Sequence, residues 1–153
     1  MFFKKKKKEK KGLLEITDIK DLACELNERL LDKCDDNDQP INMTHPQRVI
    51  FLCVMIENAG QADMISEFFE SYPTYYDEVV SALTEIGAVK SAELIRSAIN
   101  LIPKEGVFSL DEESEEWEKI MDIDEKFAFY PDGLLAILYF CYVHKHKKDF
   151  EDL

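Results

Sequence analysis

The sequence has little of what enzymes use to bind phosphate groups or metal ions. Its 153 residues include five glycines, and neither a Gly-x-Gly-x-x-Gly motif nor a Walker-type loop occurs, which argues against a phosphate-binding loop. His144 and His146 are two residues apart and point to different helix faces, whereas zinc ligands on one face are spaced i, i+4. Carboxylates are abundant, but no pair stands out as an acid and base couple. We therefore expect no enzymatic activity, no cofactor and no metal site.

Long apolar runs and paired cysteines are also missing. No apolar run approaches the roughly 20 residues of a membrane-spanning helix, and no apolar segment typical of a secretory signal follows the basic N-terminus. The cysteines form no Cys-x-x-Cys pair, and three of the four lie in apolar stretches: Cys24, Cys34, Cys53 and Cys141. We expect them to be small buried residues in a reducing compartment. The sequence thus predicts a cytoplasmic protein.

Basic residues are scarce beyond the first twelve positions. The chain has 19 Lys and Arg against 32 Asp and Glu, for a formal charge of −13. Residues 1–12 hold seven Lys and one Glu, which leaves 12 basic and 31 acidic residues, a charge of −19, in residues 13–153. Such a surface repels nucleic acid and attracts basic partners. We expect residues 1–12 to be a flexible Lys-rich tail and residues 13–153 to form one acidic, all-helical domain.

Apolar residues recur at helical spacing in the first half of the chain. The first helix is expected to begin near Thr17 or Asp18, either of which suits the N-cap. Thr44 and Gln47 form a capping box that opens a second helix. The residues that follow, Val49–Ile56, are all apolar, so they form either a central buried helix or a buried strand. The capping box favours the helix.

Helix-breaking residues mark the ends of the segments that follow. Gly60 and Gln61 are expected to interrupt the second helix, and a short helix then stops near residues 72–73. Gly87 is expected to end the next helix, because glycine best tolerates the left-handed conformation at the C′ position. Another helix continues until Pro103. The short turn at Gly87 makes these last two helices antiparallel neighbours.

Two further helices are expected in the last third of the chain. Ser109 and Glu112 form a second capping box, which opens a strongly acidic segment that runs to Glu125. The sequence Pro131-Asp132-Gly133 opens the last helix, whose residues 134–143 leave little polar face and indicate a central position. The predicted fold is therefore an all-α single domain, an irregular bundle of six to eight helices.

The acidic segment is the most unusual part of the sequence. Between Glu105 and Glu125, ten acidic residues stand against one base, Lys119. In a continuous helix these 21 residues would span about 32 Å, or about one carboxylate per 3 Å, close to the charge spacing of about 3.4 Å on one DNA strand. The residues we expect to contact a partner are Asp111, Glu112, Glu115, Glu116, Glu118 and Asp122.

The periodicity of this segment suggests how the carboxylates are arranged. In one helix, Asp111, Glu115, Glu118 and Asp122 would share a face, while Leu110, Trp117, Ile120 and Met121 would share another. Like charges at i, i+4 cost about 0.2–0.5 kcal/mol per pair, so a Lys at any of these acidic positions is expected to recover stability. The alternative is that the acidic helix is an ordinary solvated face that favours solubility.

Several motifs resemble those of a known family. They are Glu57-Asn58-Ala59-Gly60, Phe68-Phe69, Ala82 to Ala88 with its Ile-Gly-Ala sequence, and Ile123-Asp124-Glu125-Lys126-Phe127. Together they resemble the bacterial family of DNA mimic protein nineteen over roughly residues 45–150. The resemblance implies an all-α acidic protein whose founding member imitates DNA, sequesters a transcription factor and forms a homodimer.

The leading hypothesis is a non-enzymatic protein that presents its acidic segment, together with Asp35, Asp36 and Asp38, to the basic groove of a DNA-binding protein. Two alternatives stay open. One is an immunity or antitoxin-like inhibitor that covers the basic active site of a nuclease toxin. The other is a membrane-surface adaptor, in which Lys4 to Lys11 make weak contact with anionic lipid.

Overall fold

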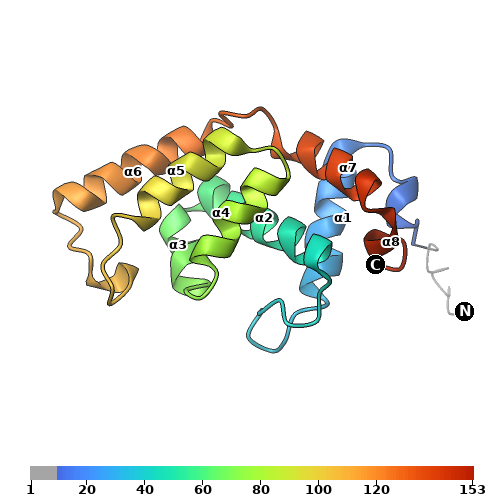
Figure 1. Ribbon diagram of the computed structural model, residues 1–153, viewed down its shortest axis with the longest axis horizontal. Helices are drawn as coiled ribbons and strands as arrows, with labels where there is room; N and C mark the ends of the chain where they lie inside the picture. Colours follow the sequence, from blue (N-terminus) through green and yellow to red (C-terminus); the bar gives the residue numbers. More distant parts are fainter. Residues whose placement is uncertain (1–9) are drawn as a thin grey trace, which may run out of the picture.

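The computed structural model describes residues 10–153, which form eight α-helices and two short 3₁₀ turns (Figure 1). In chain order these are η1 (Leu13–Glu15), α1 (Ile19–Leu31), α2 (His45–Ala62), α3 (Ile65–Ser71), α4 (Tyr76–Glu85), α5 (Val89–Ile99), η2 (Val107–Ser109), α6 (Glu115–Ala128), α7 (Leu135–Lys145) and α8 (Lys147–Phe150). No strand occurs in this range. The prediction of an all-α irregular bundle is confirmed. The prediction of a flexible tail falls mainly on residues 1–9, outside the described residues.

Helix α2 is the centre of the bundle. As predicted, the Thr44 side chain accepts a hydrogen bond from the backbone N–H of Gln47, and the Gln47 side chain accepts one from the N–H of Thr44. Every residue of Val49–Ile56 is buried except Met55, which is half-buried. Helices α1, α3, α4, α6, α7 and α8 all contact α2. The apolar run therefore forms a helix covered on all sides.

Gly60 does not end α2, contrary to the prediction from its sequence. The helix continues through Gly60 to Ala62, and Gly60 is buried. A Cβ atom at this position would lie 2.7 Å from Cδ1 of Phe127, a buried side chain of α6. Glycine is thus needed here for the close approach of two helices. The sequence alone does not distinguish a glycine that ends a helix from one that leaves space for an aromatic ring of a neighbouring helix.

The turn between α4 and α5 follows the prediction. Gly87 has a φ of +94°, and the two helices pack against each other. The carboxylate of Asp132, which was expected to help open the last helix, instead accepts hydrogen bonds from the N–H groups of Lys90 (3.1 Å) and Ser91 (2.7 Å) at the start of α5. Asp132 therefore joins the α6–α7 connection to α5, and α7 begins only at Leu135.

Helix α7 is not central, so the prediction of a central position for residues 134–143 is wrong. One side, formed by Leu135, Tyr139, Tyr142 and Val143, is buried. On the other side Ile137 is 48% exposed, and the neighbouring Leu134 is 45% exposed. Because α2 already occupies the centre, α7 packs on α1 at the periphery and leaves an apolar face uncovered by residues 10–153. None of the helices in this range is both long and apolar enough to cross a membrane.

The cysteines only partly match their predicted environments. All four cysteines are free, but Cys24 and Cys141 are exposed, Cys34 is half-buried and only Cys53 is buried. The prediction of buried cysteines is therefore wrong for Cys24 and Cys141, because each lies on the outer side of a peripheral helix.

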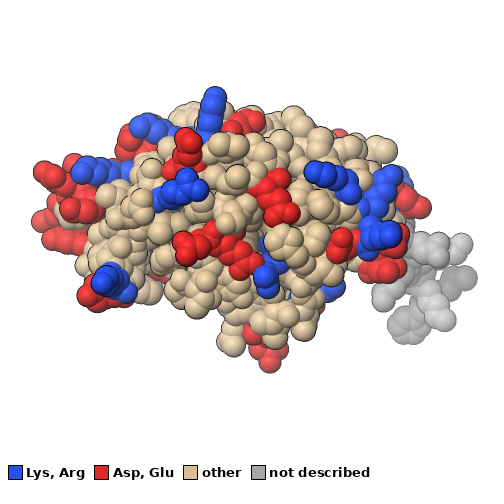
Figure 2. Space-filling view, viewed as in Figure 1, with Lys and Arg blue, Asp and Glu red and all other residues tan. Residues whose placement is uncertain are grey.

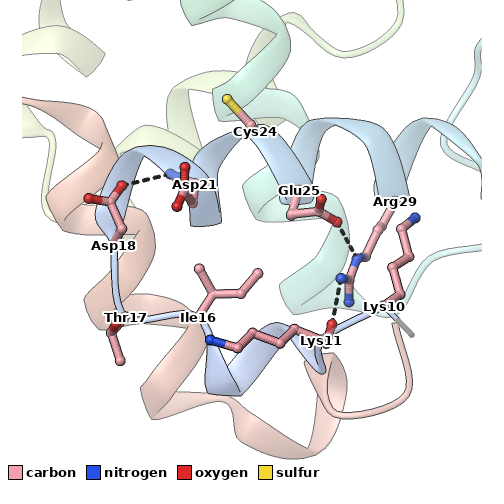
Figure 3. A pocket seen from close by; sticks show the side chains of 9 residues that line it. All are labelled: Lys10, Lys11, Ile16, Thr17, Asp18, Asp21, Cys24, Glu25 and Arg29. Carbon is pink, nitrogen blue, oxygen red and sulfur yellow. Dashed lines mark hydrogen bonds and ion pairs between the residues drawn. The ribbon is translucent and has the colours of Figure 1, made fainter. Parts of the chain in front are cut away.

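Arg29 joins both ends of the described chain to α1, and Figure 3 shows its contacts with Glu25 and Lys11. Its side chain is 8% exposed and forms an ion pair with Glu25 at 2.8 Å. It also donates to the carbonyl oxygens of Lys11 (2.7 Å) and Leu153 (3.1 Å). A cation this deeply buried needs such partners. Both ends of the described chain, Lys10 and Leu153, therefore lie at the same end of the molecule, opposite the start of α6 (Figure 1).

The contact between Gly60 and Phe127 yields a prediction for stability. Replacing glycine by alanine inside a helix normally stabilises by about 1 kcal/mol. Gly60→Ala should instead lower the free energy of unfolding by about 1 kcal/mol or more, since overpacking a core costs about 1–3 kcal/mol. Urea denaturation measures the change. The double variant Gly60→Ala/Phe127→Leu should lose less than the sum of its single variants; additive losses would mean that the ring is not the obstacle.

Candidate protein-interaction surface

The acidic helix begins later than its sequence predicts. Ser109 does not cap it: this residue belongs to η2, and its hydroxyl donates to the carbonyl oxygen of Gly106 at 2.9 Å. The N-cap of α6 is Ser114, whose Oγ accepts from the N–H of Trp117 at 3.2 Å. The capping box predicted for Ser109 and Glu112 is therefore wrong.

Asp111 explains the later start. Its side chain accepts a hydrogen bond from the N–H of Glu113 at 2.9 Å, and its carbonyl oxygen accepts one from the Ser114 hydroxyl at 2.6 Å. Asp commonly stabilises such a turn through its own side chain. The turn reverses the chain before Ser114 and delays the helix until Glu115.

The buried stripe of α6 also differs from the predicted one. Ile120, Ile123 and Phe127 are buried, whereas Met121 is 50% exposed. Leu110 precedes the helix altogether. At about 100° per residue, the three buried side chains fall on one side of the helix, and Met121 falls outside it. The prediction of a shared apolar face for Leu110 and Met121 is therefore wrong.

The predicted ladder of carboxylates is shorter than expected. Only Glu115, Glu118 and Asp122 share the outer face, because Asp111 precedes the helix. Lys119 and Lys126 lie on the same face, and Lys126 forms an ion pair with Asp122 at 2.8 Å. The 14 residues of α6 span about 21 Å. A DNA-like charge spacing over 32 Å is therefore not present, and Lys119 and Lys126 offset part of the negative charge after the first turn.

The negative charge concentrates where α6 begins. Residues 111–118, called the acidic end here, contain six carboxylates in eight positions, and no Lys or Arg occurs between residues 105 and 118. All six are exposed: Asp111, Glu112, Glu113, Glu115, Glu116 and Glu118. They form the acidic group at the left edge of the molecule in Figure 2. Five of them were predicted to contact a partner, and Glu113 was missed although it lies in the same turn as Glu112.

The helix dipole reverses one energetic expectation. Glu115, Glu116 and Glu118 lie in the first turn of α6. Each carboxylate near a helix N-terminus stabilises by about 0.3–1 kcal/mol, more than the 0.2–0.5 kcal/mol cost of a like-charge pair. A Lys at these positions would therefore lower stability. The helix dipole is therefore enough to explain why carboxylates occur in the first turn. Glu112 and Glu113 lie in the preceding turn, outside the helix, and do not gain this stabilisation.

Other acidic residues in the predicted region have structural roles. Asp124 accepts a hydrogen bond from the N–H of Ile65 at 2.8 Å and so joins α6 to the start of α3; burial raises its pKa. Asp35 accepts from the N–H groups of Asn37 and Gln39, both at 2.9 Å, within the loop between α1 and α2. That loop lies away from the start of α6 (Figure 1), so Asp35, Asp36 and Asp38 do not extend the acidic end.

Two carboxylates lie apart from this solvated group, beside α7. Glu85 accepts hydrogen bonds from the Tyr142 hydroxyl and from a His45 ring nitrogen, both at 2.9 Å. Burial alone would raise the pKa of Glu85, but these partners outweigh it and lower the pKa. His45, the first residue of α2, thus links the start of α2 to the end of α4.

Glu57, in contrast to Glu85, has a raised pKa. Its Oε1 accepts a hydrogen bond from the hydroxyl of the fully buried Tyr139 at 3.2 Å. No Lys, Arg or His among the described residues forms an ion pair with it. Burial raises the pKa of Glu57, and hydrogen bonds from Tyr130 and Tyr139 offset only part of this effect. Within residues 10–153, Glu57 is thus a half-buried carboxylate without an ion-pair partner.

Comparison with known proteins identifies the family. A family model described as DMP19-like protein matches residues 41–146. The chain belongs to the DMP19-like family. This confirms the family resemblance seen in the sequence. The matched range of this DMP19-like chain extends from just before α2 to the end of α7, so it includes the acidic end and Glu57. No curated protein and no solved structure shows significant similarity to the chain.

Glu57 yields a prediction for the pH dependence of stability. Because its pKa is higher in the folded state, its effect on stability is absent below the ordinary pKa near 4.5. As the pH rises from there through the folded pKa, the unfolded state loses its proton first, and stability falls. Glu57→Gln should therefore raise the melting temperature at pH 7 but not at pH 3.5. A variant less stable than the parent at pH 7 would contradict this assignment.

Proposed function

We propose that this DMP19-like protein is a non-enzymatic binding protein whose acidic end occupies the DNA-binding surface of a basic protein. One observation carries the proposal: six exposed carboxylates fall within residues 111–118, with no basic residue from 105 to 118. Charge of one sign at such density attracts a basic partner before contact and orients it.

The spacing of these charges suits a surface that binds phosphates. Residues 111–114 form a turn and residues 115–118 the first helical turn, so the acidic end extends on the order of 20 Å at most. Six carboxylates over this length correspond to roughly one charge per 3 Å along the chain. Neighbouring phosphates on one DNA strand are about 3.4 Å apart along the helix axis. The match covers a short piece of one strand, which favours a partner that grips a few phosphates.

Phe108 supplies an apolar contact beside the acidic end. It lies in η2, three residues before Asp111, and is 79% exposed. Exposed aromatic side chains beside polar groups are typical anchors of protein interfaces. Electrostatic attraction mainly accelerates association, whereas a desolvated anchor slows dissociation. Phe108 and the carboxylates would thus contribute to different steps of binding.

The Lys-rich tail would act independently of this surface. The described chain begins at Lys10, at the end of the molecule opposite the acidic end (Figure 1). Contact of the tail with anionic lipid would therefore leave the acidic end exposed. The nuclease-inhibitor alternative uses the same carboxylates, so the identity of the captured partner distinguishes it from DNA mimicry of a transcription factor.

The function can be tested by affinity capture from the source cell. The protein should retain a basic DNA-binding protein at about 50 mM salt and release it at about 500 mM, because salt screens exposed charges. A DNA duplex should displace the same protein. The triple variant Glu112→Gln/Glu113→Gln/Glu116→Gln should weaken capture at least tenfold.

A matched variant controls for the loss of net charge. Glu70→Gln/Glu93→Gln/Glu151→Gln removes three exposed carboxylates elsewhere and should bind like the parent. Equal losses in both triple variants, or a partner that DNA does not displace, would refute the proposal. Capture of a nuclease whose activity is blocked would instead establish the inhibitor alternative.

We also propose that two copies associate through the exposed face of α7. Residues 127–143 contain one charged residue, Asp132, and its carboxylate is bonded to the start of α5. In a chain with 33% charged residues, two like-charged copies repel each other less at a surface with so few charges. Leu134 and Ile137 lie here, with Val89 of α5 next to Asp132 and 50% exposed.

Sedimentation equilibrium tests this association. Ile137→Asp places a charge on the apolar face and should convert a dimer to a monomer, with little effect on the fold because Ile137 is 48% exposed. Ile41→Asp, at a 62% exposed position in the loop between α1 and α2, is the matched control and should stay dimeric. A parent protein that is monomeric at all concentrations would exclude the association.

A further inference from the structure

A cavity of about 270 Å³ opens beside Glu57, between α1, α2 and α7. Its polar lining comes from three helices: Asn27 and Glu28 of α1, Glu57 and Asn58 of α2, and Tyr139 of α7. Ala23 and Val54 provide apolar wall. At about 30 Å³ per water molecule, this space holds a small organic group. The cavity is separate from the acidic end, which lies on α6 and the turn before it.

The lining is rich in hydrogen-bond acceptors. Glu57 contributes a carboxylate, held in place by the Tyr139 hydroxyl at 3.2 Å, and Glu28 contributes a second, exposed carboxylate. Asn58 donates through Nδ2 to Oδ1 of Asn27 at 2.9 Å, which leaves its own carbonyl oxygen as an acceptor. A ligand that satisfies this lining must donate several hydrogen bonds.

The charge of the lining points to a cation. Glu57 is half-buried and has no ion-pair partner within residues 10–153. Partial burial of an unpaired charge is unfavourable, and a cation beside the carboxylate offsets this cost. The buried cation of α1, Arg29, cannot serve, because Glu25 and the carbonyl oxygens of Lys11 and Leu153 engage it. Within residues 10–153 no three side chains gather in a metal-binding group. The apolar wall instead favours an organic cation with an alkyl stem.

We propose that this cavity binds one alkylammonium or guanidinium group, with Glu57 as its counter-ion. The group pairs with the Glu57 carboxylate and donates to the Asn58 carbonyl, while its alkyl stem lies against Ala23 and Val54. Such a group belongs either to a free small molecule or to a Lys or Arg side chain of a protein. A half-buried carboxylate that lines a cavity without an ion-pair partner among the described residues is typical of a binding site, where function and stability conflict.

Titration with small cations tests the site. The probes are n-propylguanidine and n-butylamine, added to the full-length protein at 150 mM salt and followed by amide chemical shifts in NMR spectra. The shifts should be confined to residues that line the cavity. Neutral n-butanol and anionic butyrate should produce no saturable shifts, because neither replaces the missing counter-ion.

Two variants and one control locate the binding. Glu57→Gln should weaken binding at least tenfold because it removes the counter-ion. Ala23→Leu, which keeps the carboxylate but fills the cavity, should weaken it to a similar extent. Glu125→Gln removes an exposed carboxylate on α6 and should bind like the parent. Equal affinity of the parent and Glu57→Gln would overturn the proposal, as would equal weakening in Glu125→Gln.

A second set of probes separates the two sources of the cation. Binding of the small cations supports a free ligand, and binding of only a Gly-Ser peptide with one central Arg supports a protein side chain. If neither the small cations nor the peptide binds, the proposal is wrong. The triple variant of the acidic end should retain cavity binding, so failure of this site and failure of the proposed function are distinguishable.

Discussion

Helix α2 must be covered on every side, and the positions of the other helices follow from this requirement. Seven of the eight residues of Val49–Ile56 are fully buried. Burial of each such side chain contributes about 1.5–3 kcal/mol, so this segment contributes on the order of 10–20 kcal/mol, comparable to the whole net stability of a domain. Helices α1, α3, α4, α6, α7 and α8 each supply part of the cover. Gly60 allows α6 to approach closely enough for Phe127 to complete it.

The same requirement determines where the charges lie. Helix α6 packs through the stripe Ile120, Ile123 and Phe127 near its middle and C-terminal end, so its first turn extends beyond the core. The acidic end is therefore free to carry charges that would be intolerable nearer the centre. Glu57 is on α2 itself and is held half-buried at the edge of the core, beside the cavity. The described part of the protein thus has solvated carboxylates, which act at a distance and weaken with salt, and a half-buried carboxylate, which acts mainly on a group in contact with it.

Local sequence signals predicted those features that depend on a few neighbouring residues. The N-cap role of Asp18, the capping box at Thr44 and the positive φ at Gly87 were all correct, since each is satisfied within one or two turns of chain. The capping box at Ser109 was wrong although its residues fit the motif equally well. There the turn at Asp111 competes for the same segment, and Ser114 supplies an equivalent cap five residues later.

The sequence by itself determined the helical fold class, the family, the central position of the apolar run and the presence of an acidic segment. These properties depend on composition, on periodicity and on hydrogen bonds between near neighbours. Only the tertiary structure decided that Gly60 leaves space for the Phe127 ring and that α7 leaves an apolar face exposed. It also decided that Glu57 lies beside a cavity without an ion-pair partner among the described residues. Each of these depends on which distant helix occupies the adjacent space, and no local pattern in the chain records that choice.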